Sequence, residues 1–257
     1  AEAATMFFGA RSRQQVKDGA NKLFVDSNIF PQTLAVIQTR SNPQGIEVKV
    51  GDYKTFEFDN TYFGAILQYP NADGNIEDYK AFTEKAHNAS CKVAVATDLM
   101  ALTLLVPPGE CGADVAFGSA QRFGTPMFYG GPSAAFFATK DEFKRSIPGR
   151  IIGISKDAYD KPAFRMALQT REQHIKREKA TSNICTAQAL LATMSGFYAV
   201  YHGPEGLKNI AKRIQTATAI IADEWDALGY KQLNSQSCGL LKFPLSKYVK
   251  QEVIRNI

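Results

Sequence analysis

The residues best suited to chemistry lie in one polar run, positions 170–186. Its residues are Thr-Arg-Glu-Gln-His-Ile-Lys-Arg-Glu-Lys-Ala-Thr-Ser-Asn-Ile-Cys-Thr. Ser182 and Asn183 directly precede an apolar segment, so we expect them to cap a helix there. The free N–H groups at a helix start bind anions, and the nearby Arg177 and Lys179 would add positive charge. The run therefore predicts an anion-binding site.

A solvated helix face is the alternative interpretation of this run. Glu172 and Lys176 are four residues apart, the spacing at which opposite charges pair along a helix. Charge runs of this kind usually only face solvent. His174 stands alone, and we expect it to satisfy local hydrogen bonds rather than to transfer protons. Both interpretations stay open on the residues alone.

A second candidate is Asp98, which follows the apolar stretch 92–97. Ligands of open α/β sheets sit at the carboxyl ends of the strands. A carboxylate in that position can pair with a ring nitrogen or hold a metal. The alternative role is an N-cap for a short helix over residues 99–105.

A glycine-rich segment follows Asp98, with glycines at positions 118, 124, 130 and 131. Glycine lets the backbone approach a ligand or a second chain closely, and it also forms tight turns. The pattern matches neither a P-loop nor a dinucleotide-binding fingerprint. A nucleotide-binding domain is therefore a weak alternative for this chain.

These candidates need an α/β framework, and the hydrophobic pattern supplies one. Short apolar runs predict strands at 22–26, 46–50, 63–69, 92–97, 113–117 and 134–138. Capped or amphipathic stretches predict helices at 1–20, 31–44, 76–89, 141–146, 185–201 and 205–228. This alternation implies right-handed crossovers, and hence a mostly parallel sheet between two layers of helices.

The pattern also predicts three parts along the chain. Residues 1–184 form the core of a large domain, 185–229 are connecting helices, and 230–257 begin a smaller α+β domain. The first residues look like the inside of a helix without a cap, so we expect both ends to be cut from a longer chain.

Composition argues against several classes of protein. Of 257 residues, 45% are hydrophobic and 21% charged, as in an ordinary folded protein. A net charge of +5 does not by itself indicate nucleic-acid binding. The four cysteines are scattered, and His87, His174 and His202 lack ligand spacing, so no metal site is expected. No apolar run approaches the about 20 residues that span a membrane, and the first residues lack a targeting signal.

The 170–186 run resembles a signature of the glycine dehydrogenase (decarboxylating) family, the P-protein of the glycine cleavage system. Residues 107–114 and 130–133 resemble that family too, and the similarity covers essentially the whole chain. The resemblance implies the three-layer fold of pyridoxal-phosphate-dependent enzymes of the aspartate-aminotransferase type. It also implies two related halves, on one chain or on two subunits.

The resemblance further implies which half this chain represents. In the family's catalytic half, a Gly-Ala-Asp-Val block leads to a His-Lys pair whose lysine forms a Schiff base with the cofactor. Alignment on Phe123, Pro126 and residues 130–132 puts Ala120 at the histidine and Gln121 at the lysine. Glutamine cannot form a Schiff base, so we expect the amino-terminal half, inactive alone.

The resemblance implies a full enzyme that decarboxylates glycine through pyridoxal phosphate attached to the other half. The aminomethyl group would pass to the lipoyl arm of the H-protein. Asp98 would be the degenerate counterpart of the aspartate that pairs with the pyridine nitrogen. The expected contributors at the interface with the catalytic half are Arg171, His174, Arg177, Lys179, Ser182 and Asn183. The assembly is expected to be dimeric, in the cytoplasm of a bacterium or in the mitochondrion of a eukaryote.

Two other functions remain as alternatives at this stage. In one, the chain is a non-catalytic scaffold for dimerisation and H-protein docking. In the other, it is an independent pyridoxal-phosphate enzyme, such as an aminotransferase or desulfurase. Gln121 argues against the second, because position 121 offers no amine to the cofactor.

Overall fold

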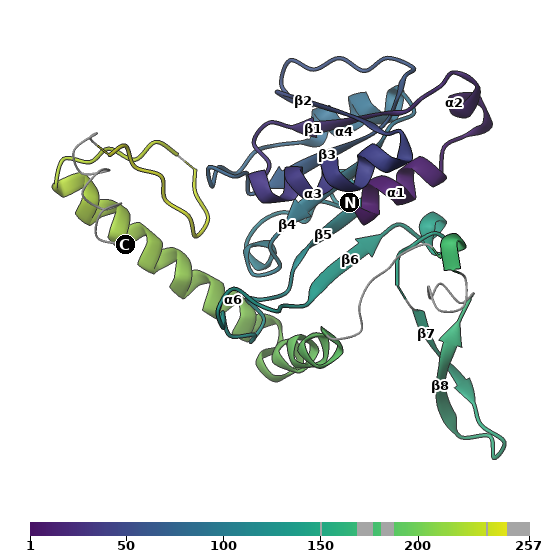
Figure 1. Ribbon diagram of the computed structural model, residues 1–257. Helices are drawn as coiled ribbons and strands as arrows, with labels where there is room; N and C mark the ends of the chain where they lie inside the picture. Colours follow the sequence, from purple (N-terminus) through teal and green to yellow (C-terminus); the bar gives the residue numbers. More distant parts are fainter. Residues whose placement is uncertain (150, 169–176, 181–187, 235, 246–257) are drawn as a thin grey trace.

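The computed structural model describes residues 1–257 except 150, 169–176, 181–187, 235 and 246–257. A six-stranded sheet with the order β2-β1-β3-β4-β5-β6 forms its centre (Figure 1). The strands are β1 (Lys22–Asp26), β2 (Glu47–Gly51), β3 (Tyr62–Tyr69), β4 (Lys92–Thr97), β5 (Val115–Ser119) and β6 (Ala135–Thr139). The first five are parallel, and β6 is antiparallel to β5. The predicted mostly parallel sheet is confirmed.

Helices cover both faces of the sheet: α1 (Glu2–Gly9), α3 (Pro31–Ser41) and α4 (Lys80–Asn88). The single helix predicted for residues 1–20 was wrong, because a second helix, α2 (Arg13–Lys17), begins after a break. Ser12 causes that break with a capping box. Its hydroxyl accepts the Gln15 amide at 3.1 Å, and its own amide donates to the Gln15 side chain at 3.0 Å.

Two apolar clusters hold the layers together. Phe7 of α1 and Ile37 of α3 pack on one face of the sheet, while Phe82 of α4 packs on the other. All eight residues of β3 are buried, as expected for the central strand of a covered sheet. Gly64 lets Phe7 approach β3, since a Cβ there would lie 3.1 Å from the Phe7 ring.

The predicted pair of helices after residue 185 is present as α6 (Ala189–Ala227), which changes direction at Gly203. Gly203 has non-helical torsions, and Pro204 follows it, so the chain begins a new helix there. Among the described helices, none has a stretch both long and apolar enough to cross a membrane.

Two further regions differ from the predicted elements. A hairpin of β7 (Ile151–Lys156) and β8 (Pro162–Ala167) was not predicted. The helices predicted at 99–105 and 141–146 are only 3₁₀ turns, η2 (Ala101–Thr103) and η3 (Asp141–Phe143). Between 230 and 245 the described residues form no strand beyond one bridge of Ser237 with Asn75, so the α+β domain from 230 stays a prediction.

Candidate functional site at the carboxyl edge of the sheet

Strand topology brings the candidate residues to one edge of the sheet. Strands β1, β3, β4 and β5 run parallel, so their carboxyl ends meet. Thr97 at the end of β4 pairs with Tyr69 at the end of β3. Asp98 follows directly, and the glycine-rich loop leaves the end of β5 beside it. This is the edge where open α/β sheets bind their ligands.

Asp98 already has protein partners for both of its carboxylate oxygens. Its Oδ1 accepts the amide of Met100 at 2.9 Å, so Asp98 caps the turn η2. Its Oδ2 forms an ion pair with Nη1 of Arg122, which comes from the glycine-rich loop. The pair is partly exposed, with 28% of the Asp98 side chain and 35% of the Arg122 side chain accessible. Asp98 is therefore held by the chain itself.

Gln121 is also bound within its own loop. Its side-chain amide donates to the carbonyl of Thr125 at 2.7 Å, and the Thr125 amide donates to the Gln121 carbonyl at 3.1 Å. The backbone amide of Gln121 donates to the Ser119 hydroxyl at 3.1 Å. These bonds close the loop between residues 119 and 125. The Gln121 side chain is bound to the loop's own backbone, at Thr125.

The glycines of this loop serve the packing of the chain on itself. A Cβ at Gly118 would lie 1.9 Å from the carbonyl oxygen of Thr97, a contact that no side chain tolerates. A Cβ at Gly124 would lie 2.7 Å from the ring of Tyr198 on α6. At Gly130 and Gly131 no such crowding occurs, and their positive φ angles, +96° and +131°, indicate turns. The predicted tight turns are present, whereas the close contacts at Gly118 and Gly124 are made within the chain, so an approach to a ligand or a second chain stays a prediction.

Most of the polar run 170–186 lies outside the described residues. That holds for Arg171, His174, Ser182 and Asn183. Arg177 and Lys179 belong to a 3₁₀ turn, Arg177–Lys179, in which Arg177 is exposed and has a φ of +52°. The role of the run at an interface therefore stays a prediction.

A buried carboxylate at the opposite edge of the sheet was missed by the sequence analysis. Asp114 accepts Lys140 Nζ at 2.7 Å, the Val93 amide at 2.8 Å and His87 Nε2 at 2.9 Å. Burial alone would raise the pKa of Asp114, but the bonds from Lys140, Val93 and His87 outweigh it and hold that pKa below its usual value. The aspartate of the Gly-Ala-Asp block thus joins α4, β4 and the end of β6.

A second buried carboxyl, Asp26, ends β1 on the α4 face. It is 0% exposed, and within the described part of the chain neither oxygen has a hydrogen-bond partner. Burial raises the pKa of Asp26 to about 6. The nearby amides of Asn28 and Tyr53 counteract this only in part, because neither reaches hydrogen-bond geometry. The sequence signal for Asp26 is its place at the end of the apolar run 22–26.

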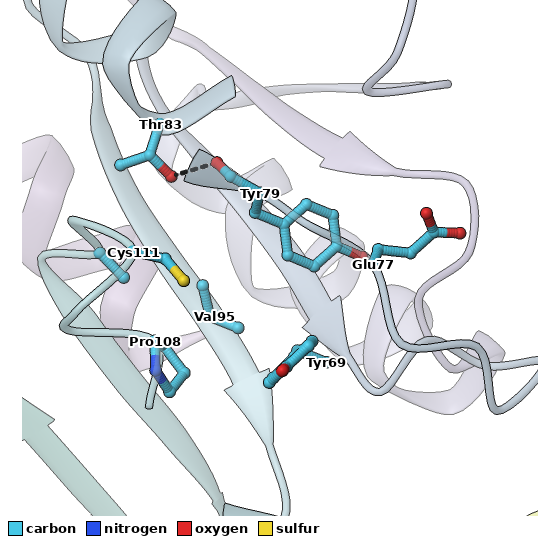
Figure 2. A pocket seen from close by; sticks show the side chains of 8 residues that line it. Tyr69, Glu77, Tyr79, Thr83, Val95, Pro108 and Cys111 are labelled. Atoms are coloured by element: carbon cyan, nitrogen blue, oxygen red, sulfur yellow. Dashed lines mark hydrogen bonds between the residues drawn. The ribbon is translucent and has the colours of Figure 1, made fainter. Parts of the chain in front are cut away.

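A cavity on the α4 face of the sheet is too small for a cofactor (Figure 2). It has room for about one water molecule. It is lined by Tyr69, Glu77, Tyr79, Thr83, Val95, Pro108, Cys111 and Ala113. Over the described residues, no group of three or more histidine, cysteine or acidic side chains is placed to hold a metal.

Comparison with known proteins decides the family. The model for "Glycine cleavage system P-protein" matches residues 1–249. The chain belongs to this family. A glycine dehydrogenase (decarboxylating) of Bacteroides fragilis is 63% identical over 257 residues, which are 100% of this chain and 27% of that protein. One from Flavobacterium johnsoniae is 57% identical over 235 residues, or 91% of this chain and 25% of that one.

The solved structures agree with this assignment. An inhibitor-bound glycine decarboxylase (P-protein) of the glycine cleavage system matches 88% of this chain and 51% of its own, with a TM-score of 0.77 and 32% identity. A cysteine desulfurase from Thermococcus onnurineus matches 99% of this chain and 65% of its own, with a TM-score of 0.58 and 14% identity, which shows the fold alone. The family resemblance and the aspartate-aminotransferase-type fold are confirmed. The chain spans about a quarter of the length of its curated P-protein relatives.

The residues at the carboxyl edge do not fit a covalently held pyridoxal phosphate. The side chain of Gln121 is an amide, which cannot form a Schiff base, and it is bound to Thr125. Both carboxylate oxygens of Asp98 already accept bonds from within the chain, one from Met100 and one from Arg122. In this P-protein segment the edge is therefore closed by the chain's own groups.

Proposed function

We propose that this chain is part of a glycine decarboxylase, in the amino-terminal half that lacks the Schiff-base lysine. The family match supports the enzyme, and Gln121 supports the half. The full protein would take glycine as its substrate and pass the aminomethyl group to the lipoyl arm of the H-protein. Pyridoxal phosphate, attached to the other half, would supply the electron sink for decarboxylation. This half would carry out no covalent step.

An exposed apolar surface supports a dimeric assembly with the catalytic half. Leu190, Met194, Phe197 and Tyr201 follow helical spacing along α6, and their exposed fractions are 69%, 37%, 69% and 86%. Side chains at this spacing share one face of a helix. Soluble monomers rarely expose an apolar stripe of this size, which is typical of interaction sites.

The hairpin β7–β8 presents a second apolar surface. Ile152 lies opposite Met166, and Ile154 opposite Phe164, so the four side chains share one face. Ile154 is 79% and Phe164 81% exposed. An isolated two-stranded hairpin is only marginally stable in water, so a partner against this face is favoured.

At this interface we propose roles for Arg171, His174, Arg177, Lys179, Ser182 and Asn183. Guanidinium groups bind carboxylate or phosphate in a bidentate manner, and helix caps offer N–H donors. The test is glycine–bicarbonate exchange by the full-length enzyme with Arg177→Ala or Asn183→Ala. In Arg177→Ala, exchange should fall at least about tenfold, the loss expected when one charge-assisted contact is removed, and Asn183→Ala should lower it too by removing a helix cap. Arg13→Ala, an exposed arginine on α2, is the matched control and should exchange as the unchanged enzyme does.

The scaffold role is the second candidate, and the exposed stripe on α6 favours it too. Unchanged exchange in both variants with an intact assembly would leave this half as a scaffold that binds the catalytic half and the H-protein. A pull-down of H-protein that weakens with salt would then identify the basic run as its docking site.

A further inference from the structure

The chain returns to the carboxyl edge of the sheet after α6. The return segment, residues 236–242, runs back from the end of that helix toward the sheet (Figure 1). Its Gln236 carbonyl accepts the Ile76 amide at 3.0 Å, and Ser237 forms a bridge with Asn75. At its far end, Lys242 Nζ pairs with Asp73 Oδ1 at 2.5 Å.

The return segment also has internal supports. Asn234, 1% exposed, donates to the Leu240 carbonyl at 2.8 Å and accepts the Lys242 amide at 2.9 Å. The Gly239 amide donates to the Gln215 side chain of α6 at 3.2 Å. These bonds from Asn234 and Gln215 hold the return segment at the carboxyl edge of the sheet.

Arg122 lies between the return segment and Asp98. A Cβ placed on Gly239 would lie 3.7 Å from Nη1 and 3.9 Å from Nη2 of Arg122. The neighbouring Cys238 lies close enough for both charges to affect its thiol. Burial raises the pKa of that thiol, Arg122 lowers it in part, and Asp98 adds to the rise. One guanidinium therefore contacts the end of β4 and lies against the segment that follows α6.

We propose that Arg122 is a positioning residue that acts as the permanent cation partner of Asp98 and holds the return segment closed over this edge. Arg122 thus provides the positive charge that balances Asp98, at the edge where open α/β sheets bind their ligands. An unpaired carboxylate at a half-covered edge would attract water or an outside cation, whereas the fixed guanidinium satisfies it. Three segments distant in sequence meet at this pair.

The contacts predict which amides depend on Arg122. They are the amides whose hydrogen bonds hold the return segment in place, those of Ile76 and Gly239. The Val93 amide, bound to Asp114 at the opposite edge, should not depend on it. This inference goes beyond the proposed function, because it concerns the closure of the edge and not glycine turnover.

Hydrogen–deuterium exchange of the full-length protein tests the proposal. In Arg122→Ala, peptides with Ile76 and residues 236–242 should exchange at least about tenfold faster, as expected for local opening, while the Val93 peptide is unchanged. Arg122→Lys keeps the charge and should restore most of the protection. Lys140→Ala is the matched control: it breaks an ion pair at the opposite edge and should speed exchange at Val93 only.

Three results would overturn the proposal. One is unchanged exchange of the return segment in Arg122→Ala. A second is equal acceleration at Val93, which would mean general destabilisation. The third is full loss of protection in Arg122→Lys, which would rule out the charge as the cause. None of these measurements depends on decarboxylation, so they are independent of the proposed activity.

Discussion

Gln121 donates its side-chain amide to the carbonyl of Thr125 at 2.7 Å. Where the family resemblance places a reactive lysine, this chain thus has a group that stabilises its own loop. Asp98 is likewise bound within the chain, because its two oxygens accept bonds from Arg122 and Met100. At the carboxyl edge of the sheet, the side chains of Gln121 and Asp98 are thus bound by the chain's own groups.

Asp26→Asn should stabilise the protein at neutral pH. The folded pKa of about 6 exceeds the ordinary 3.8, so the buried carboxyl opposes folding once it ionises. In the folded state the carboxyl stays neutral up to about pH 6, whereas in the unfolded chain it ionises from about pH 3.8, so stability is lost as the pH rises from 3.8 through about 6. The amide should raise the free energy of unfolding by roughly 1–3 kcal/mol at pH 7.5 and by little at pH 4. Urea unfolding at both values measures this, and an equal loss at both would contradict it.

Asp114→Asn should have the opposite effect. The side chain is 1% exposed, and its lowered pKa means that its ionised form stabilises the fold. This contribution is present above pH 3.8 and disappears as the pH falls through the lower, folded pKa. Asp114 is buried but the Lys140 side chain is 43% exposed, so loss of the ionised group should cost about 1–3 kcal/mol at pH 7.

An exposed ion pair provides the control for Asp114. Lys231→Ala removes a pair with Asp226 whose side chains are 77% and 53% exposed, and it should change the unfolding midpoint little. Equal effects of the two substitutions on the urea midpoint would show that burial of Asp114 contributes nothing.

Gly118→Ala should destabilise the edge far more than Gly130→Ala. The new Cβ at 118 meets the Thr97 carbonyl at 1.9 Å, so β4 and β5 must separate. The loss should exceed roughly 3 kcal/mol. At Gly130 nothing lies within 4 Å, and only its φ of +96° is strained, at about 1–3 kcal/mol. Thermal unfolding of the two variants compares them, and a smaller loss at 118 would contradict the packing argument.

The strands were predictable from their apolar or alternating runs, which are buried in β1, β3 and β4 and only partly covered in β2 and β6. Strand 22–26 was predicted with its bounds, and 113–117 was displaced by two residues from Val115–Ser119. The hairpin of β7 and β8 was not predicted. Its apolar side chains are exposed, so it does not follow the rule that a strand's apolar face is buried in a core. The polar contacts were not found either. Asp98 meets Arg122 only when the loop after β5 folds back, a tertiary event without a local signal.

The anion site at the polar run could be predicted only in part. Helix caps and basic residues are visible in the sequence, and Arg177 is exposed as a binding residue requires. What such a site binds depends on the partner that completes it, and the local pattern does not carry that information. The same holds for the stripe on α6, whose helical spacing was visible while its exposure was not.

The central claim, that this half holds no Schiff base, is tested most directly by locating the cofactor in the full-length protein. The enzyme is loaded with pyridoxal phosphate, reduced with borohydride and digested, and the labelled lysine is found by mass spectrometry. We predict that no label falls within residues 1–257. Lys140 and Lys144, the lysines nearest in sequence to Gln121, should be unlabelled, because they follow the end of β6 at the opposite edge of the sheet, where Lys140 pairs with Asp114. Stoichiometric label on either lysine would contradict the account.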